Sequence, residues 1–425
     1  MSILYDLIFI IFALCYLPVL FLKRKFHKGF MGRFGSLPSG LQFERPLWIH
    51  AVSVGEMMSV KPFIALLREV FPGKQLVIST VTATGNSIAG KAAQPGDIVL
   101  YLPVDLRCAV KKYVERISPA IFIAAETELW PNLIAYLFRK NIPFVVINGR
   151  ISDASFRRYR MVSFLLRGLF NKISLYCVQT DRDRQKLLQL GLSEDKIRVA
   201  GNIKFDISVQ RTGGFSNCRA RLGLSAGHKL LVAGSTHPGE EHILFNAYRS
   251  LQGDFPDLRL LLAPRHPERS KEIGKIAAHH GFHPVFVSCI PGPPYVVRQS
   301  FNTVFILDTV GELLSFYEAG DIAFVGGSLI RKGGHNILEP AVFGKPIIFG
   351  PFMSNFRDIA ELFLQHKAAL LARNEGELKE KIRFLLGDPP RMAALGEEGK
   401  KLIALNQGAT RKTFEYIKGF IKENR

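Results

Sequence analysis

Acidic side chains follow two apolar segments in the first half of the chain, where each segment gives way to a polar turn. Glu56 lies in HAVSVGE, and Glu126 and Glu128 lie in ETELWPN. A carboxylate at such a turn could act as a general base, a role worth ~10²- to 10⁴-fold in rate, or it could orient a substrate hydroxyl or stabilise developing positive charge. The alternatives are a favourable interaction of Glu56 with a helix N-terminus, and capping and packing roles for the other two residues.

Two more turns of this half carry amide and basic side chains. Asn148 and Arg150 lie in INGRISD, and Lys204 lies in GNIKFD. Arg150 could meet an anionic group of a substrate, and Lys204 suits a phosphate or carboxylate as a mobile point charge. A solvated arginine, an intramolecular ion pair and a surface lysine are the alternatives.

The second half of the chain has similar turns with neutral and basic donors. Ser235 and Thr236 lie in GSTHPGEE, and Arg265 lies in APRHPER. The hydroxyls are donors beside an expected helix start, and the planar arginine fork recognises phosphate or carboxylate. His237 and His266 lack the paired spacing of metal ligands, so hydrogen-bonding roles are favoured for them.

The glycine-containing string GGSLIRKGGHNILEP is the most distinctive of these turns. Gly333 and Gly334 would let the backbone approach a phosphate closely, and a helix expected to begin near His335 and Asn336 would present free N–H groups to it. Glu339 could accept hydrogen bonds from a ribose. The string is neither GxGxxG nor GxxxxGK(S/T), so a nicotinamide cofactor or ATP is poorly supported.

The elements that must position these turns are short apolar segments that alternate with helical patterns, which is typical of parallel sheets with crossover helices. The strands expected in the first half are 47–51, 76–80, 98–102, 120–125, 144–148, 175–179 and 198–200. Those expected in the second half are 230–234, 258–263, 283–287, 303–307, 322–326, 346–349 and 368–371. The sequence therefore predicts two doubly wound α/β domains, which bind ligands at the carboxyl ends of their strands.

The length of 425 residues and a polar, glycine-containing segment after Asp206 also indicate two large domains. The expected division is an anchor at 1–22, a first domain at 23–207, a linker at 208–226, a second domain at 227–405, and a C-terminal helix at 406–425 that could pack back on the first domain.

The chain is strongly basic, with 56 Lys and Arg against 36 Asp and Glu and a net charge of +20. Such an excess favours an anionic partner. The sequence has no zinc-finger spacing, RNA-binding signature or basic array interleaved with aromatics, which argues against nucleic acid. Its five cysteines are widely separated, which argues against structural zinc. A membrane surface is the favoured partner, and no metal is expected.

Residues 3–22 are almost wholly apolar and, at ~1.5 Å per helical residue, long enough to cross a hydrocarbon core of ~30 Å. Asp6 lies near the start, where it can reach the interface. Four basic residues follow, and the positive-inside rule then places the rest of the chain in the cytoplasm: Lys23, Arg24, Lys25 and Lys28. The sequence predicts a single retained anchor. An amphipathic or buried helix that packs on the globular part is the alternative.

Taken together and in order, HAVSVGE, ETELWPN, GNIKFD, STHPGEE, PRHPER, DTVGEL and FVGGSLIRKGGHNILEP, with the apolar N-terminus, resemble the bacterial 3-deoxy-D-manno-octulosonic acid (Kdo) transferases of lipopolysaccharide synthesis. The likeness extends to about Gly408. It implies a GT-B fold, with two Rossmann-like doubly wound domains facing a cleft. The acceptor would be bound mainly by the first domain and CMP-Kdo by the second, at the cytoplasmic face of the bacterial inner membrane.

The resemblance also implies residue roles. Glu56 would be the general base, and Glu126 and Lys204 would stabilise the transition state. The residues expected to contact the CMP-Kdo donor are Ser235, Thr236, Pro264, Arg265, Val310, Gly311, Glu312, Gly333, Gly334, Asn336, Ile337, Leu338 and Glu339. Those expected on the acceptor side are Arg33, Ser53, Glu128, Asn148 and Arg150.

The expected function is an inverting, metal-independent transfer of Kdo from CMP-Kdo to lipid A precursor, lipid IVA, with no cofactor beyond the donor. Glu56 would take the proton of the acceptor hydroxyl as its oxygen attacks the anomeric carbon, and the turn at Gly333 and Gly334 would stabilise the leaving phosphate. Two alternatives stay open. One is a GT-B transferase that uses another nucleotide sugar on a lipid-linked acceptor, and the other is a membrane-anchored protein that binds anionic lipid without catalysis.

Overall fold

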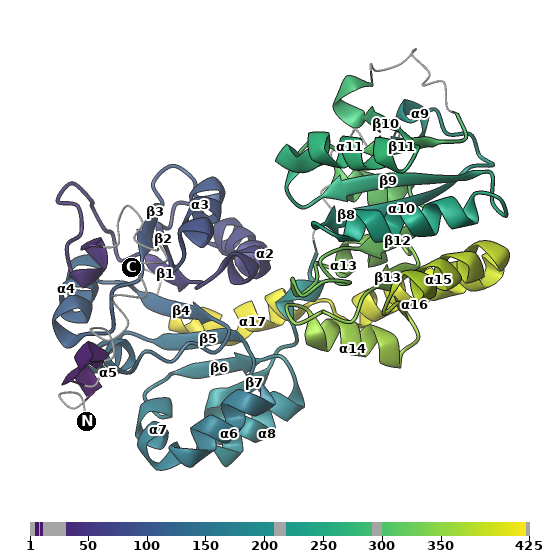
Figure 1. The fold of residues 1–425 in the computed structure, drawn as a ribbon. Helices are drawn as coiled ribbons and strands as arrows, with labels where there is room; N and C mark the ends of the chain where they lie inside the picture. The colour runs from purple at the N-terminus through teal and green to yellow at the C-terminus, as the bar shows by residue number, and fades with distance from the viewer. Residues whose placement is uncertain (1–4, 8, 12–30, 208–217, 291–299, 422–425) are drawn as a thin grey trace. The chain divides into compact units, whose positions relative to one another are not determined.

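The computed structural model describes residues 5–7, 9–11, 31–207, 218–290 and 300–421 (Figure 1). The chain divides into two compact units. Unit 1 comprises Met1–Asp206 and Asn406–Arg425, and unit 2 comprises Ile207–Leu405. Each unit is built around one seven-stranded sheet whose described pairings are all parallel. The two parallel-sheet α/β domains predicted from the sequence are therefore confirmed.

The sheet of unit 1 has the order β3-β2-β1-β4-β5-β6-β7. Its strands are β1 (Leu47–His50), β2 (Leu76–Thr80), β3 (Ile98–Tyr101), β4 (Ile121–Ala125), β5 (Phe144–Gly149), β6 (Leu175–Val178) and β7 (Ile197–Val199). The strand order reverses between β1 and β4, and this switch point is where such a sheet binds ligands. Short 3₁₀ helices in this unit are η1 (Met31–Phe34), η2 (Glu194–Lys196), η3 (Ile203–Phe205) and η7 (Lys418–Phe420).

Helices cover both faces of this sheet because buried strand side chains alternate between them. Trp48 points into one apolar cluster and Ile49 into the other. The Trp48 face is covered by α4 (Arg107–Ile117), α5 (Pro131–Arg139), α7 (Ser163–Phe170) and α8 (Asp181–Gln189). The Ile49 face is covered by α2 (Val54–Val70), α3 (Ala83–Ala92) and α17 (Ala409–Ile417).

The sheet of unit 2 has the order β10-β11-β9-β8-β12-β13-β14, with its switch point between β8 and β12. Its strands are β8 (Lys229–Thr236), β9 (Leu258–Pro264), β10 (His283–Phe286), β11 (Thr303–Ile306), β12 (Ile322–Val325), β13 (Ile347–Phe349) and β14 (Leu370–Leu371). The fourteen strands predicted from the sequence are thus all present, and no strand end differs from the prediction by more than two residues.

The helices of unit 2 also lie on both faces of its sheet. One face packs on α10 (Glu240–Leu251), α11 (Ser270–His279) and α15 (Glu375–Gly387), and the other on α9 (Cys218–Arg221) and α12 (Leu313–Ala319). The remaining helices are α13 (Leu338–Ala341), α14 (Arg357–Gln365) and α16 (Pro389–Asn406), with 3₁₀ helices η5 (Pro267–Arg269) and η6 (Val287–Cys289).

The last helix, α17, belongs to unit 1 although it follows unit 2 in the chain. Its apolar residues Phe414 and Ile417 complete the cluster on the Ile49 face. The Asp206 carboxylate, at the end of the first pass through unit 1, accepts the N–H groups of Gly408 (2.6 Å) and Thr410 (2.5 Å). A distant carboxylate thus pairs N–H groups that the first turn of α17 leaves without a helical partner.

The N-terminal residues that the structure describes contact unit 1. Asp6, which was expected to reach a membrane interface, lies instead 2.5 Å from Arg107 Nε at the start of α4, and it accepts the Asn132 side-chain N–H (2.7 Å) at the start of α5. Most of the anchor predicted at 3–22 lies outside the described residues. Within the described ranges, no helix combines the length and apolar character needed to cross a membrane.

Removal of the Asp206 carboxylate should loosen the attachment of α17. We expect Asp206→Ala to lower the free energy of unfolding of unit 1 by ~1 to 3 kcal/mol, because two N–H groups lose their acceptor. Chemical denaturation followed by tryptophan fluorescence reports on unit 1 alone, since both tryptophans, Trp48 and Trp130, lie in it. Asp388→Ala is the control, because Asp388 accepts the Arg391 N–H in unit 2. Equal unfolding midpoints for Asp206→Ala and the wild type would contradict the role given to Asp206.

Candidate active site

Glu56 lies at the switch point of unit 1, in the first turn of the helix that follows β1. Ser53 caps α2, and its hydroxyl accepts the Glu56 N–H (3.4 Å). The Glu56 carboxylate accepts the Val52 N–H (2.6 Å) and the Ser53 hydroxyl (3.0 Å). This arrangement closely resembles a capping box, in which the acid at the third helical position reaches back to the helix start. Glu56 therefore lies at the helix N-terminus, as the alternative considered for it requires, and the same contacts fix its carboxylate at the carboxyl end of β1.

The other predicted catalytic residues meet Glu56 from neighbouring strands. Glu126 follows β4 in a left-handed conformation (φ 57°), which turns the chain sharply at the strand end. Its Oε1 lies 3.3 Å from Lys204 Nζ of η3, which follows β7. Glu128 lies two residues further on, close enough that the charges of Glu56 and Glu126 act on it. The structure thus brings three carboxylates and one lysine to the same edge of the sheet.

This crowding changes the proton affinity of the acids. Burial raises the pKa of Glu56 to about 7, assisted by the nearby Glu126 and opposed by the Val52 N–H, the Ser53 hydroxyl and Lys204. Burial raises the pKa of Glu128 to about 8, assisted by the charges of Glu56 and Glu126. A carboxyl group with a pKa near 7 can both accept and release a proton near neutral pH, as a general base must.

Asn148 holds η3, the short helix that carries Lys204, in place. Asn148 is buried at the end of β5 with φ 54°, and its Oδ1 accepts the Ile203 N–H of η3 (3.1 Å). Arg150 follows, and its backbone N–H and C=O both pair with the Thr127 hydroxyl beside Glu126 (3.1 and 2.5 Å). Asn148, predicted on the acceptor side, is only 1% exposed, and its bond to Ile203 positions the segment that carries Lys204.

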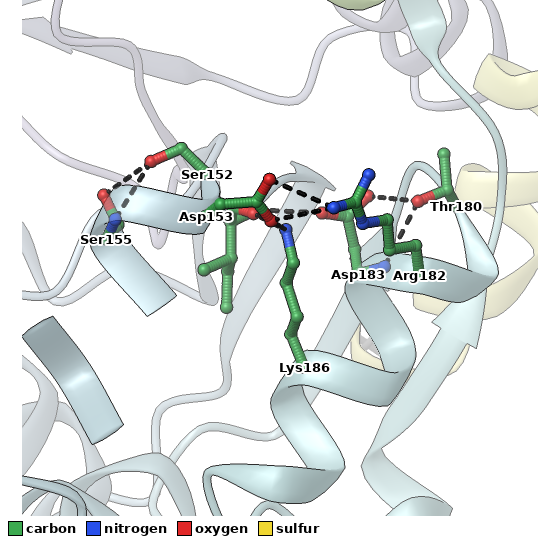
Figure 2. Close-up of polar contacts among 8 residues, drawn as sticks. Ser152, Asp153, Ser155, Thr180, Arg182, Asp183 and Lys186 are labelled. Atoms are coloured by element: carbon green, nitrogen blue, oxygen red, sulfur yellow. Dashed lines mark hydrogen bonds and ion pairs between the residues drawn. The ribbon is translucent and has the colours of Figure 1, made fainter. Parts of the chain in front are cut away.

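The segment after Arg150 is fixed by α8. Asp183 accepts the Ile151 N–H (3.0 Å), and Lys186 Nζ donates to the Ile151 carbonyl (2.5 Å). Figure 2 shows Arg182 and Lys186 directed toward Asp153 at the start of α6 (Asp153–Met161), at 3.0 and 2.8 Å. These contacts hold the chain on both sides of the β5 turn.

Sequence reasoning placed Arg33 on the acceptor side and missed its neighbour His50. Arg33 Nε donates to the Leu102 carbonyl after β3 (2.8 Å). His50, the last residue of β1, is fully buried, with Nδ1 at 3.0 Å from Ser79 Oγ. Burial lowers the His50 pKa to about 3, and the charge of Arg33 contributes. His50 is therefore a neutral, buried residue close to the site. Its position as the first residue of HAVSVGE is the sequence feature from which its place near Glu56 could have been predicted.

In unit 2 the predicted donor residues come from four adjacent strands. Ser235 and Thr236 end β8, and the Arg265 N–H donates to the Thr236 carbonyl (3.0 Å), which ties the end of β9 to that of β8. Pro264 is the last residue of β9. Exposed Val310 and Gly311 follow β11, where Glu312 pairs with Arg221 (2.7 Å) and the Thr309 hydroxyl. The order of these strands brings the turns to one edge.

The glycine turn after β12 differs from the expectation. The helix there, α13, begins at Leu338, two positions after Asn336, and has only four residues. Gly333 and Gly334 have φ 91° and 71°, and a Cβ atom would lie 2.6 Å from Asn355 Nδ2 at the first and 2.2 Å from Met353 Sδ at the second. Backbone conformation and internal packing therefore explain both glycines without a phosphate.

The residues after this turn are held by local hydrogen bonds. Asn336 Oδ1 accepts the Leu338 N–H (3.2 Å), and its amide donates to Glu339 Oε1 (3.4 Å). Ile337 and Leu338 are buried. Burial raises the pKa of Glu339 to about 6, against the opposing effects of Asn336 and Arg265. The positive charge of Arg265, after β9, therefore lies close enough to Glu339, in α13, to lower the pKa of that carboxyl group.

Glu240 is the structural centre of the unit 2 edge, and sequence reasoning missed it. Its carboxylate is fully buried and accepts the N–H groups of Gly327 (2.7 Å), Ser328 (3.0 Å) and Leu329 (3.0 Å) after β12. It also accepts the His237 N–H (3.0 Å) after β8. In the string HPGEE this residue reads as an ordinary acid of a first helical turn. Its four backbone donors lie in the turns after two different strands, β8 and β12, so the sequence around Glu240 does not predict these contacts.

Among the residues that the structure describes, no group of three or more His, Cys, Asp and Glu could hold a metal ion. The four described cysteines are free.

Two parallel-sheet α/β units, each with polar side chains at its switch point, define a two-domain protein of the GT-B kind. A crystal structure of UDP-N-acetylglucosamine 2-epimerase has this fold, with a TM-score of 0.58 at 13% identity over 91% of this chain and 99% of that one. The family model of 3-deoxy-D-manno-octulosonic-acid transferase (kdotransferase) matches residues 28–207.

Two named transferases are similar over most of the chain. The 3-deoxy-D-manno-octulosonic acid transferase of Haemophilus influenzae is 34% identical over 382 residues, 89% of this chain and 88% of that one. The enzyme of the same name from Chlamydia trachomatis serovar A is 31% identical over 426 residues, 98% and 97% of the two chains. The chain belongs to the Kdo transferase family and is a glycosyltransferase. Membership of this family favours the enzyme over the non-catalytic lipid-binding alternative.

The raised pKa of Glu128 makes the stability of unit 1 depend on pH. Folded unit 1 keeps this proton up to about pH 8, whereas the unfolded chain releases it near the ordinary glutamate pKa of 4.5. The contribution is therefore fully present below pH 4.5 and is lost as the pH rises toward 8. We expect Glu128→Gln to gain more than ~1 kcal/mol over wild type between pH 5 and pH 8, since one pKa unit is ~1.36 kcal/mol.

Urea denaturation followed by tryptophan fluorescence at both pH values measures this difference. Glu44→Gln, at an exposed position of the same unit, is the matched control. A stability difference between Glu128→Gln and wild type that is the same at both pH values would contradict this account.

Proposed function

We propose that the enzyme transfers Kdo from CMP-Kdo to a lipid A precursor, lipid IVA, by a single inverting displacement. The observation that carries this proposal is Glu56 at the unit 1 switch point, held by the Val52 N–H and the Ser53 hydroxyl, with a pKa of about 7. Family membership supports Kdo as the transferred group. We propose lipid IVA as the acceptor and CMP as the nucleotide that carries Kdo.

In this mechanism Glu56 accepts the proton of an acceptor hydroxyl while that oxygen bonds to the anomeric carbon of Kdo. The bond from this carbon to the phosphate oxygen breaks, and its electron pair leaves with CMP. Glu126 stabilises positive charge that develops on the sugar, and Lys204, 3.3 Å from Glu126, orients that carboxylate and offsets the surrounding negative charge. Arg33, Ser53, Glu128 and Arg150 would meet the acceptor, directly or through the turns that they hold.

Unit 2 would bind the nucleotide with the turns at the ends of β8, β9, β11 and β12. Arg265 would meet the phosphate through its planar fork, and Glu339 would accept hydrogen bonds from the ribose. We propose that no metal ion takes part. A transferase of another nucleotide sugar remains the rival, and identification of the released nucleotide as CMP or UDP separates the two.

We further propose that the enzyme works on the membrane surface at the cytoplasmic face of the inner membrane. Support comes from an exposed patch at the junction of α6 and α7, where Met161, Val162 and Phe164 are 80%, 39% and 77% exposed. No residue of α6 is buried, and its outward arginines flank the patch: Arg157, Arg158 and Arg160. Apolar tips beside basic residues match the chemistry of an anionic lipid interface.

Replacement of the base should remove most of the activity. We expect Glu56→Gln to lower kcat by at least ~10²-fold, the scale of a general base, whereas Glu44→Gln at an exposed site leaves it unchanged. In the wild type, kcat/KM should rise with pH through about 7, because the carboxylate must be free of its proton. Glu126→Gln should move this rise to lower pH and Lys204→Met to higher pH, since Glu126 raises and Lys204 lowers the pKa of Glu56. Near-normal turnover of Glu56→Gln would refute the assignment.

Contact of the patch with lipid can be measured directly. We expect the fluorescence of an added tryptophan in Phe164→Trp to be quenched by brominated lipid in vesicles that contain phosphatidylglycerol. The control is Leu405→Trp, in unit 2, at a position that is also 80% exposed. Equal quenching of the two added tryptophans would show that the α6–α7 junction does not enter the interface.

A further inference from the structure

Two histidines that are 98 positions apart in the sequence form a direct pair at the switch point of unit 2. His237 follows β8 and His335 follows the glycine turn after β12. Their Nε2 atoms are 2.9 Å apart, and the two ring planes are nearly parallel (6°) with centroids 5.1 Å apart, so the rings meet edge to edge through these nitrogens. One Nε2 must therefore carry a proton and donate it to the other, so the pair in its neutral state already shares one hydrogen bond.

The pair is a built feature of the fold. The buried Glu240 carboxylate accepts the His237 N–H and also the N–H groups of Gly327, Ser328 and Leu329, so the two histidine-bearing turns share one anchor. Gly327 lies against both rings, and a Cβ atom there would come within 3.1 Å of His335 and 3.3 Å of His237. Both histidines are only partly buried, which leaves them accessible to a ligand.

The groups that face the pair are mostly basic. Arg265, Arg269 and the ring of His266, from the turn after β9, act on His237 together with Lys332 from the β12 turn. Burial lowers the pKa of His335 to about 4, and Arg265, His237 and His266 add to this effect. Burial also lowers the pKa of His237. Glu240 is engaged by backbone N–H groups. Both imidazoles are thus neutral near pH 7 unless an anion arrives.

We infer that the His237–His335 pair takes up one proton when a phosphate binds at the switch point of unit 2, and that the resulting imidazolium donates a hydrogen bond to the phosphate of the leaving nucleotide. The inference deepens the proposed function and rests on it. During transfer the bond between the anomeric carbon and the phosphate oxygen breaks, and its electron pair adds one negative charge to that phosphate. The proton of the acceptor hydroxyl goes to Glu56, and the proton on the histidine pair comes from solvent.

This arrangement favours the transition state over the bound donor. The phosphate carries one negative charge in a sugar nucleotide and gains a second as the nucleotide leaves. A proton shared by two imidazoles is held more strongly as that charge grows, so the interaction is greater in the transition state than in the ground state. Arg265 and Lys332 carry fixed positive charges, whereas the histidine pair adds its charge only when the anion is present.

Calorimetric titration of the full-length enzyme with CMP in buffers of different ionisation enthalpy tests the inference. At pH 7.5, where CMP is a dianion, we expect a measurable uptake of a fraction of a proton per CMP bound, because an anion within ~4 to 6 Å raises a pKa by ~1 to 3 units. Cytidine, which has no phosphate, should bind without proton uptake.

The double variant His237→Gln/His335→Gln should lose the uptake while it still binds cytidine, and its kcat should fall by more than ~tenfold. The matched control is His242→Gln/His280→Gln, which removes the other histidine pair of unit 2, 2.9 Å apart on α10 and after α11. Cytidine binding shows that the variant is folded, and the single variant His335→Gln, with reduced uptake expected, covers a failure of the double variant to fold.

Proton uptake that persists in the double variant, or that disappears equally in the control, would overturn the inference. CMP binding with no uptake in the wild type would also overturn it and leave the proposed function standing. An enzyme that binds UDP and not CMP would instead overturn the proposed function, and the same titration with UDP would then test the pair by itself.

Discussion

Parallel pairing of the strands is the constraint on which both units depend. A parallel strand must be followed by a crossover, so every loop that leaves the carboxyl end of a strand emerges at the same edge of the sheet. In unit 1 this edge gathers Glu56, Glu126 and Lys204 from β1, β4 and β7. In unit 2 it gathers the turns after β8, β9, β11 and β12. Residues that are distant in the sequence become neighbours because, in each sheet, the loops that carry them all begin at the same edge.

Two carboxylates show how this edge serves structure and chemistry by different means. Glu240 is fully buried and accepts four backbone N–H groups, two at each carboxylate oxygen, so its hydrogen bonds all hold backbone turns in place. Glu56 accepts one backbone N–H and one hydroxyl, and like charges lie nearby. The four N–H donors oppose the effect of burial on the first carboxylate, although burial still raises the pKa of Glu240. Incomplete compensation leaves the second one ready to accept a proton.

The sequence predicted the strands well because apolar segments between polar turns show both the period and the length of buried parallel strands. It also predicted Glu56, Glu126 and Lys204 at strand ends, and the structure brings these three together. It could not predict the buried role of Glu240 or the pairing of His237 with His335, because their partners come from other strands. The sequence placed the start of α13 near His335 and Asn336, and the helix begins two positions later, at Leu338; it did not predict that this helix has only four residues.

The return of the chain to unit 1 after unit 2 has a consequence for biosynthesis. Asp206 leaves the ribosome 200 residues before Asn406, where the returning segment begins. At ~5 to 20 residues per second, this interval lasts on the order of 10 to 40 s. During it, the apolar surface that receives Phe414 and Ile417 has no partner, although the strands beneath it are already complete. Unit 2, the later unit in the sequence, is therefore the first for which all parts are available, and unit 1 can close only after unit 2 has been synthesised.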